Sequence, residues 1–343
     1  MKDWAFEMQV FPVFLPHAGC RQQCLFCNQK MTTGQIEPPA ADAVAVWLDA
    51  ALPATGAGEV AYYGGTFSSL PVGQQETFLQ VAQQFVVQGR VAGIRISTCP
   101  DALQSDQVEA LAENGVTTIE IGCQSFDDNV LALNRRGHTS QDIHAAAAAC
   151  RSAGLTFGLQ LMPGLAGASD EEAMRSLSSA LELSPAFLRI YPTLVFEGTG
   201  LAQLWRDGEY TPLELDEAVD LVARQLIVCR RAGVPVIRTG LQASEGLEEA
   251  VVAGPWHPAF GQLTRARLWR WALARTVGQV DMVTVHPGDL SDALGHRREN
   301  LLWLHQFYDV KKIGVDDTLP RDSFLVGTAC HSLQETLFSG ALT

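Results

Sequence analysis

The sequence predicts an α/β fold, a partial barrel of six strand–helix units followed by a small α+β unit. Short apolar runs of strand length alternate, from residue 10 to about residue 233, with segments whose apolar residues recur at helical spacing. This alternation is typical of a parallel sheet whose strands are joined by right-handed helical crossovers. Because a closed eight-stranded barrel needs about 250 residues, six units indicate an incomplete, splayed barrel.

The barrel elements follow in chain order. An apolar run at residues 10–15 predicts the first strand, and residues 40–51, which end before Pro53, predict the first long helix. The other five strands are expected at 59–63, 93–98, 118–122, 156–162 and 187–192. Their helices are expected at 73–87, at 103–114, in a stretch that ends near 154, at 170–183 and at 213–233. Residues 234–238 could add a seventh strand.

The composition changes near residue 240, so we predict a barrel domain at 1–240 and an appended α+β unit at 241–343. The appended unit is expected to hold helices at 261–277 and 300–307 and a strand at 282–285. Two more strands are expected at 311–315 and 323–326, paired with each other through the turn around Pro320.

Acidic residues outnumber basic ones, with 38 Asp and Glu against 24 Lys and Arg and a formal net charge of −14. The excess lies in residues 1–255, since residues 256–343 carry nine of each sign. A strongly acidic body repels a phosphate backbone at long range. A nucleic-acid partner would therefore bind a local basic surface, and the C-terminal unit is the better candidate.

We expect a cytoplasmic protein with no membrane partner. The first residues lack a signal-peptide pattern, and no apolar run reaches the roughly 18 residues that span a bilayer. The eight cysteines, three of them clustered, do not have the spacing of a secreted disulfide framework.

Three of these cysteines, Cys20, Cys24 and Cys27, lie within eight residues in the loop after the first strand. Three ligands on one loop can hold one inorganic centre and leave a coordination position open for chemistry. A [4Fe–4S] cluster normally takes four thiolates, and structural zinc is closed by four ligands, so neither closed pattern fits. A zinc site completed by His17, or three ordinary buried thiols, are the alternatives.

Further candidates lie at other predicted strand ends. Gly64, Gly65 and Thr66 follow the second strand, where glycine lets the backbone approach a ligand closely, although a simple turn would also use glycine. Gln124 follows the fourth strand, and its amide can bond a ribose hydroxyl or a carboxylate. Arg136 could reach back to hold a carboxylate bidentately, with surface capping as the alternative.

The cysteine spacing, together with Phe26 before the last cysteine, resembles the radical S-adenosylmethionine (SAM) superfamily. The resemblance implies a [4Fe–4S] cluster on the three cysteines, with the amino and carboxylate groups of SAM on the fourth iron. A one-electron donor such as flavodoxin or ferredoxin would reduce the cluster, and SAM would be cleaved to a 5′-deoxyadenosyl radical that abstracts hydrogen. The expected cofactor contacts are Phe26, Gly64, Gly65, Thr66, Ser97, Gln124, Arg136 and Gln160.

A narrower resemblance, from about residue 10 to 240, is to the radical domain of the Elongator catalytic subunit, in a short form without the acetyltransferase domain. It rests on residues 122–125, 136–139, 162–165 and, most specifically, 189–201. Cys99 departs from the family pattern, which has an arginine there, so a fixed cation is lost from the pocket side. The last hundred residues show no recognisable phosphate loop for acetyl-coenzyme A.

This resemblance predicts an RNA substrate, either tRNA or ribosomal RNA. Tyr191 is the candidate catalytic residue, Thr199 a candidate substrate contact at the pocket mouth, and Arg297 and Arg298 candidate phosphate contacts. Four arginines on the helix at 261–277 offer a further basic surface, although a solvated helix face explains them as well. They are Arg265, Arg267, Arg270 and Arg275.

Two other functions stay open. A small-molecule radical SAM enzyme, resembling the oxygen-independent coproporphyrinogen oxidases, shares the cysteine spacing and suits the acidic body. A non-catalytic zinc-binding module would use the three cysteines as structural ligands.

Overall fold

The computed structural model describes residues 9–242, 246–278 and 280–339. The chain divides into two compact units, Met1–Glu214 with Val234–Trp256, and Leu215–Gly233 with His257–Thr343. This division differs from the predicted boundary at residue 240. Helix α9 (Leu215–Ala232), expected as the last barrel helix, belongs to the second unit because it packs against α11 (Phe260–Thr276).

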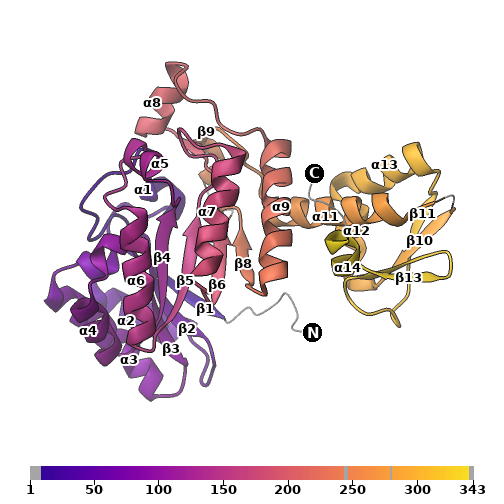
Figure 1. The fold of residues 1–343 in the computed structure, drawn as a ribbon. Helices are drawn as coiled ribbons and strands as arrows, with labels where there is room; N and C mark the ends of the chain where they lie inside the picture. The colour runs from indigo at the N-terminus through magenta and orange to yellow at the C-terminus, as the bar shows by residue number, and fades with distance from the viewer. Residues whose placement is uncertain (1–8, 243–245, 279, 340–343) are drawn as a thin grey trace. The chain divides into compact units, whose positions relative to one another are not determined.

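The first unit is built on a seven-stranded sheet in the order β1-β2-β3-β4-β5-β6-β8 (Figure 1). All neighbours in it are parallel, and the order confirms the α/β partial barrel, with the possible seventh strand present as β8. The strands are β1 (Val10–Phe14), β2 (Glu59–Tyr63), β3 (Gly93–Thr98), β4 (Val116–Gln124), β5 (Thr156–Leu161), β6 (Phe187–Ile190) and β8 (Val236–Thr239).

Long helices pack on one face of this sheet, as Figure 1 shows for α6 and α7. They are α2 (Ala41–Ala51), α3 (Val72–Val87), α4 (Ser105–Glu113), α6 (Ser140–Ser152) and α7 (Asp170–Glu182). Helix α6 shows why: Ile143, Ala146, Ala147 and Cys150 form one buried stripe at helical spacing. Its start is fixed by Thr139, which accepts from the Asp142 backbone N–H in a capping box.

Short elements that the sequence did not predict line the edge where the strands end. They are α1 (Gln29–Thr33), α5 (Asp128–Leu133), α8 (Gly200–Arg206), α10 (Leu247–Ala250), and the antiparallel pair β7 (Val195–Phe196) and β9 (Val251–Ala253). In the strands themselves, side chains alternate between the faces. Ile94 and Ile96 of β3 are completely buried, whereas Arg95 and Ser97 between and beyond them line a cavity on the other face.

The second unit combines α9 and α11 with a four-stranded sheet in the order β11-β10-β12-β13. The predicted pairing of the strands near 312 and 323 was wrong, because β10 lies between them, parallel to one and antiparallel to the other. Val283 and Val285 of β10 are fully buried, which suits a central strand. The elements are β10 (Met282–Val285), α12 (Leu290–Leu294), α13 (Glu299–Tyr308), β11 (Lys312–Val315), β12 (Ser323–Val326), β13 (Ala329–Ser332) and α14 (Leu333–Phe338).

Within the described ranges, none of the helices has the length and apolar character needed to cross a bilayer.

Candidate active site

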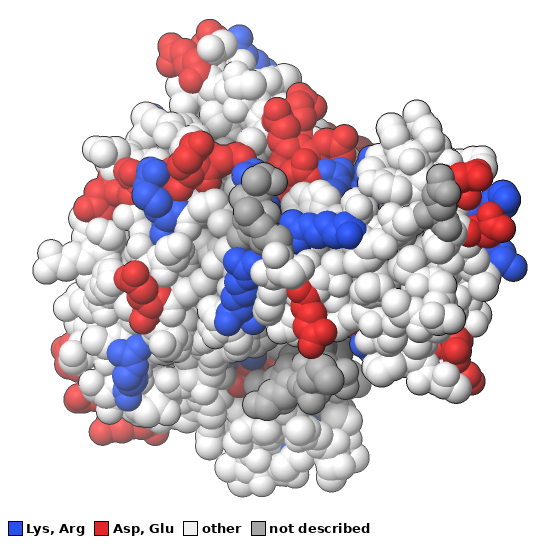
Figure 2. All heavy atoms as spheres, turned by 45° about the vertical axis from the view of Figure 1, so that its right-hand side comes forward, with Lys and Arg blue, Asp and Glu red and all other residues white. Residues whose placement is uncertain are grey.

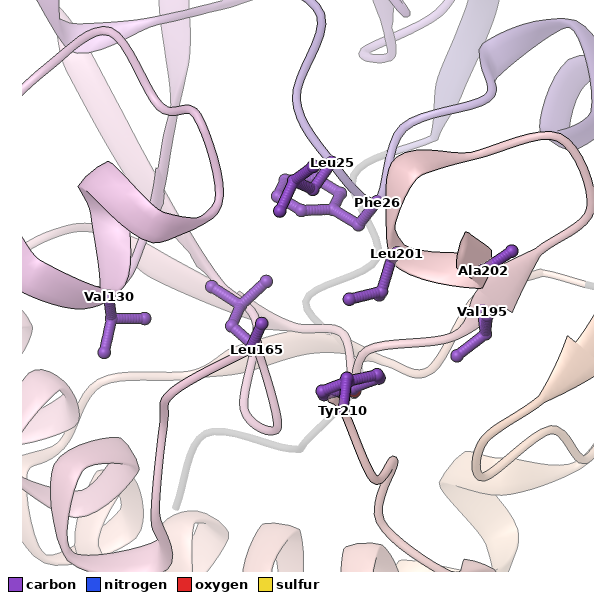
Figure 3. Close-up of a cluster of buried hydrophobic side chains, with 9 residues drawn as sticks. Leu25, Phe26, Val130, Leu165, Val195, Leu201, Ala202 and Tyr210 are labelled. Carbon is purple, nitrogen blue, oxygen red and sulfur yellow. The ribbon is translucent and has the colours of Figure 1, made fainter. Parts of the chain in front are cut away.

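Two apolar residues anchor the cysteine loop. Leu25 and Phe26, between the last two cysteines, are buried in a hydrophobic cluster (Figure 3). The backbone N–H of Leu25 donates to the carbonyl of Asn134 at 3.2 Å, and that of Leu201 donates to the Leu25 carbonyl at 2.8 Å. The other buried members are Val130, Leu165, Ala166, Val195, Leu201, Ala202 and Tyr210. Burial and backbone hydrogen bonds together therefore hold Cys24 and Cys27 in place.

The glycine turn after β2 packs directly against the cysteine loop. The Thr66 N–H donates to the Ala18 carbonyl at 2.8 Å. A Cβ on Gly65 would lie 1.9 Å from the same oxygen, and one on Gly19 would lie 2.2 Å from the Thr66 carbonyl. Only glycine allows the two loops to approach this closely. The close approach seen here is to the neighbouring loop, and the approach to a ligand stays a prediction.

Thr66 and Arg136 connect the thiols. Arg136 donates from Nη1 to Cys24 Sγ at 3.2 Å and from Nη2 to Cys99 Sγ at 3.3 Å. Thr66 Oγ1 donates to Cys99 Sγ at 3.4 Å and lies 3.7 Å from Cys20 Sγ. Cys99 thus lies beside two of the three motif cysteines. The sequence analysis noted only that it replaces an arginine of the family pattern.

Two of the motif thiols, Cys20 and Cys27, are favoured in their protonated form. Burial, and next the proximity of Cys24 and Cys20, raise the pKa of Cys27 to about 12. Burial also raises the pKa of Cys20, against the hydrogen bond from Thr66. Because the thiolate is the metal ligand, iron binding would release these protons.

The cysteine loop and the sheet enclose a cavity of about 790 Å³, a volume typical of small-molecule sites. Gln124 has a left-handed backbone conformation, with a φ of +71°, at an irregularity in the β4–β5 pairing, and its side chain lines the cavity. Its Oε1 accepts a hydrogen bond from Gln160 Nε2 at 2.9 Å. The structure brings together, along its walls, all of the predicted metal and cofactor residues and Tyr191: Cys20, Cys24, Phe26, Cys27, Gly64, Gly65, Thr66, Ser97, Gln124, Arg136, Gln160 and Tyr191.

Thr199 does not join them. It is buried, its hydroxyl donates to the Phe196 carbonyl at 2.7 Å, and it accepts from the Ala202 N–H at 3.1 Å as the N-cap of α8. Its position between glycines serves the helix start, so the expectation of a contact at the pocket mouth was wrong.

The basic residues of the second unit are mostly engaged within it. Arg265 pairs with Asp292 at 2.8 Å, Arg267 pairs with Asp216 and Asp220, Arg270 lies over the Trp303 ring, and Arg275 donates to two carbonyls of α14. Each of the four α11 arginines is therefore engaged within the unit, and two of them, Arg265 and Arg267, are in ion pairs. Arg297 and Arg298, just before α13, are exposed. On the face drawn in Figure 2, basic side chains are interspersed with acidic ones.

Sequence reasoning missed a network of buried charges in the same cavity. Arg95 pairs with Glu59 at 2.5 Å and with Glu120 at 2.6 Å, and Glu120 also pairs with Arg189 at 2.8 Å. Arg189 donates in addition to the hydroxyls of Tyr63 and Tyr191, both at 2.8 Å. Burial, and next the charge of Glu120, raise the pKa of Tyr63. In the sequence, this network could have been recognised from single charged residues within otherwise apolar strands, on the side-chain face that lines the cavity.

The residues present fit a [4Fe–4S] cluster better than zinc. His17, the proposed fourth zinc ligand, uses Nε2 to accept from the Gln29 N–H at 3.1 Å. In the described part of the chain, no three His, Cys, Asp or Glu side chains converge as ligands of a single ion would. A cluster instead gives each thiolate its own iron. The Nε of Arg136 is buried and has no hydrogen-bond partner among the described residues, so the donors of this guanidinium are not all used.

Comparisons with known proteins agree with this geometry. The family model "Radical SAM superfamily" matches residues 14–180, and the model "Radical_SAM C-terminal domain" matches residues 185–270. The chain therefore belongs to the radical SAM superfamily, whose enzymes use a [4Fe–4S] cluster and SAM. The prediction of the family and of both cofactors is confirmed, and the zinc-module alternative was wrong.

Within the superfamily, the chain's radical SAM region is homologous to that of the Elongator proteins. It is 29% identical over 185 residues to a tRNA uridine(34) acetyltransferase of Methanocaldococcus infernus, covering 48% of this chain and 35% of the relative. It is 32% identical over 191 residues to yeast (Saccharomyces cerevisiae) Elongator complex protein 3, covering 49% and 34%. The matches thus span about a third of the length of these relatives.

A solved structure confirms the fold. The Elp3 protein of Methanocaldococcus infernus, with an N-terminal deletion, superposes with a TM-score of 0.58 at 23% sequence identity. The superposition covers 76% of this chain and 62% of that one.

Proposed function

We propose that this radical SAM enzyme modifies RNA, with tRNA as its first candidate substrate. The observation that carries the proposal is the homology of its radical SAM region to proteins named for their action on tRNA uridine. Those relatives are about three times as long as the matched region, so the proposal concerns hydrogen abstraction and not acetyl transfer.

The three motif cysteines would hold the cluster. When bound, cluster and cosubstrate supply an electron and a 5′-deoxyadenosyl radical that abstracts hydrogen from the substrate. Thr66 and the glycine turn would orient the methionyl amino group, and the Arg136 guanidinium its carboxylate. Gln124 and Gln160, already hydrogen-bonded to each other, would orient the ribose.

The charged wall would receive the substrate. Tyr191 lines the cavity, and its oxygen accepts from Arg189, so its own proton is available to a bound group. Tyr191 remains the proposed catalytic side chain. Arg297 and Arg298 are exposed and remain the proposed phosphate contacts. A one-electron donor of the flavodoxin or ferredoxin type would complete the system.

A small-molecule substrate is the second candidate. The acidic excess of the chain and the pairing of the α11 arginines both disfavour a long polyanion. The cavity volume is compatible with such a substrate as well as with a single nucleotide.

Two experiments test the function. Anaerobic reconstitution should give about four irons per chain and dithionite-dependent 5′-deoxyadenosine. The Cys24→Ala variant should lose both, and the Cys330→Ala variant, at an exposed cysteine of the second unit, should keep both. Intact SAM on a fully loaded wild-type cluster would contradict the enzymatic step.

The substrate class is tested by nucleoside mass spectrometry of total RNA from cells with and without the gene. A modified nucleoside that disappears with the gene supports the RNA proposal. An unchanged set of nucleosides, beside active SAM cleavage in vitro, would favour the small-molecule candidate. Salt-dependent retention of RNA by the purified chain gives an independent measurement.

A further inference from the structure

Cys99 is placed rigidly in the cavity. It follows β3 directly and has extended backbone angles, and its carbonyl accepts from the Ala102 N–H at 3.2 Å at the start of the 3₁₀ turn Pro100–Ala102. Its side chain lines the cavity together with the three motif cysteines. The other cysteines, Cys123, Cys150, Cys229 and Cys330, do not line it.

The sulfur of Cys99 lies within cluster range of the motif thiols. Its contact of 3.4 Å with Thr66 Oγ1, and the 3.7 Å from that oxygen to Cys20, place the two sulfurs no more than about 7 Å apart. Cys99 and Cys24 accept from neighbouring nitrogens of one guanidinium, Arg136. Four thiolates are the normal ligand set of a [4Fe–4S] cluster, and this cavity supplies four thiols.

Cys99 also touches the two residues that we assign to the methionyl group of SAM. Thr66 and Arg136 both donate to its sulfur. If they instead orient the amino and carboxylate groups of SAM at the fourth iron, thiol and cosubstrate occupy overlapping positions. Arg136 keeps a buried Nε without a partner in the described chain, so its hydrogen-bonding capacity is not exhausted by the sulfurs.

We propose that Cys99 is an exchangeable fourth ligand of the cluster, bound to the fourth iron when SAM is absent and displaced when SAM binds. On ligation, the thiol releases its proton to solvent, and on displacement by the SAM amino and carboxylate groups it regains one. No electron is transferred in the exchange. The inference rests on the proposed loading of the cluster on Cys20, Cys24 and Cys27.

The exchange makes two measurable differences. A fourth thiolate protects the fourth iron from oxidative loss, so the SAM-free wild type should yield less [3Fe–4S] cluster than the Cys99→Ala variant. A competing ligand also weakens SAM binding. If the thiolate occupies about nine in ten clusters, its removal tightens SAM binding about ten-fold.

The experiment uses the full chain, reconstituted anaerobically as wild type, Cys99→Ala, Cys99→Ser and Cys123→Ala. Cys123 is buried on β4 and does not line the cavity, so its variant controls for loss of a neighbouring thiol. After a limited ferricyanide pulse without SAM, electron paramagnetic resonance measures the [3Fe–4S] signal. Equilibrium dialysis measures SAM affinity.

The proposal expects a larger [3Fe–4S] signal and tighter SAM binding in Cys99→Ala, with Cys123→Ala equal to wild type. Equal signals and equal affinities in Cys99→Ala and wild type overturn it. Should Cys99→Ala fail to retain iron, Cys99→Ser decides by the same two measurements. A wild type that takes up no four-iron cluster refutes the proposed function instead, so the two failures are distinguishable.

Discussion

The cavity has two levels that differ in chemistry. At the strand ends lie small and polar groups on loops: glycines, thiols and the Gln124 amide. Further down the strands lie charged side chains: Arg95 and Glu120 are buried, Arg189 is partly buried, and together with Glu59 they form ion pairs. The loops thus offer thiols and amides to a cluster and cosubstrate, whereas the ion pairs of the strand level stabilise and shape the wall that would receive the substrate. Breaking the two levels should have different consequences.

The largest effect is expected from Gly65→Ala at the strand-end level. The new Cβ would lie 1.9 Å from the Ala18 carbonyl, so the cysteine loop must move. We expect cluster content after reconstitution to fall to a small fraction of wild type, measured as iron per chain. Gly73→Ala, in α3 where a Cβ meets nothing within 4 Å, is the matched control. Full iron content in Gly65→Ala would show that the loops tolerate the extra atom.

Glu120→Gln tests the strand level. It keeps the volume but removes the charge that Arg95 and Arg189 share, and leaving buried charges uncompensated costs about 3–5 kcal/mol. We expect the free energy of unfolding in urea to fall by that amount. Glu197→Gln, which breaks the exposed pair with Arg206, should lower it far less, because water and salt screen an exposed ion pair. If both variants lose the same free energy of unfolding, the buried network does not stabilise the fold more than an exposed ion pair does.

A smaller effect, dependent on pH, concerns His138, whose Nε2 lies 3.1 Å from the Cys123 carbonyl just behind the strand-end level. Burial, and next the Arg136 guanidinium, lower the pKa of His138 to about 4. The unfolded chain binds a proton at this histidine near pH 6.5, so between about pH 6.5 and 4 the unfolded state holds more protons. Stability should therefore fall as pH drops through this window, by up to about 3 kcal/mol.

Urea unfolding of the apoprotein at pH 7 and pH 4.5 measures this loss. The His138→Gln variant should show a clearly smaller difference between the two pH values. A change at the exposed His305 should leave the difference as in wild type. If His138→Gln has the wild-type pH dependence, another group is responsible.

Much of the strand-end level could be predicted from residues alone. Cys20, Cys24 and Cys27 are close in sequence, whereas Gly64 and Gly65 follow β2 and Gln124 ends β4, two strands whose ends meet at one edge of a parallel sheet. Thr199 and the α11 arginines were misplaced because their partners, the Ala202 N–H and acidic residues such as Asp216, are not marked by any motif.

By itself, the sequence determined the alternation of strands and helices, the cysteine loop and the family, because apolar periodicity and a three-cysteine motif are local properties of the chain. Only the tertiary structure decided that Cys99 lies beside the motif thiols and that α9 packs with the C-terminal helices. It also decided the charge network, since Arg95, Glu120 and Arg189 come from the three strands β3, β4 and β6 and meet only in the assembled sheet. Which strands become neighbours depends on the packing of the whole sheet, so strand order cannot be read from any short stretch of sequence.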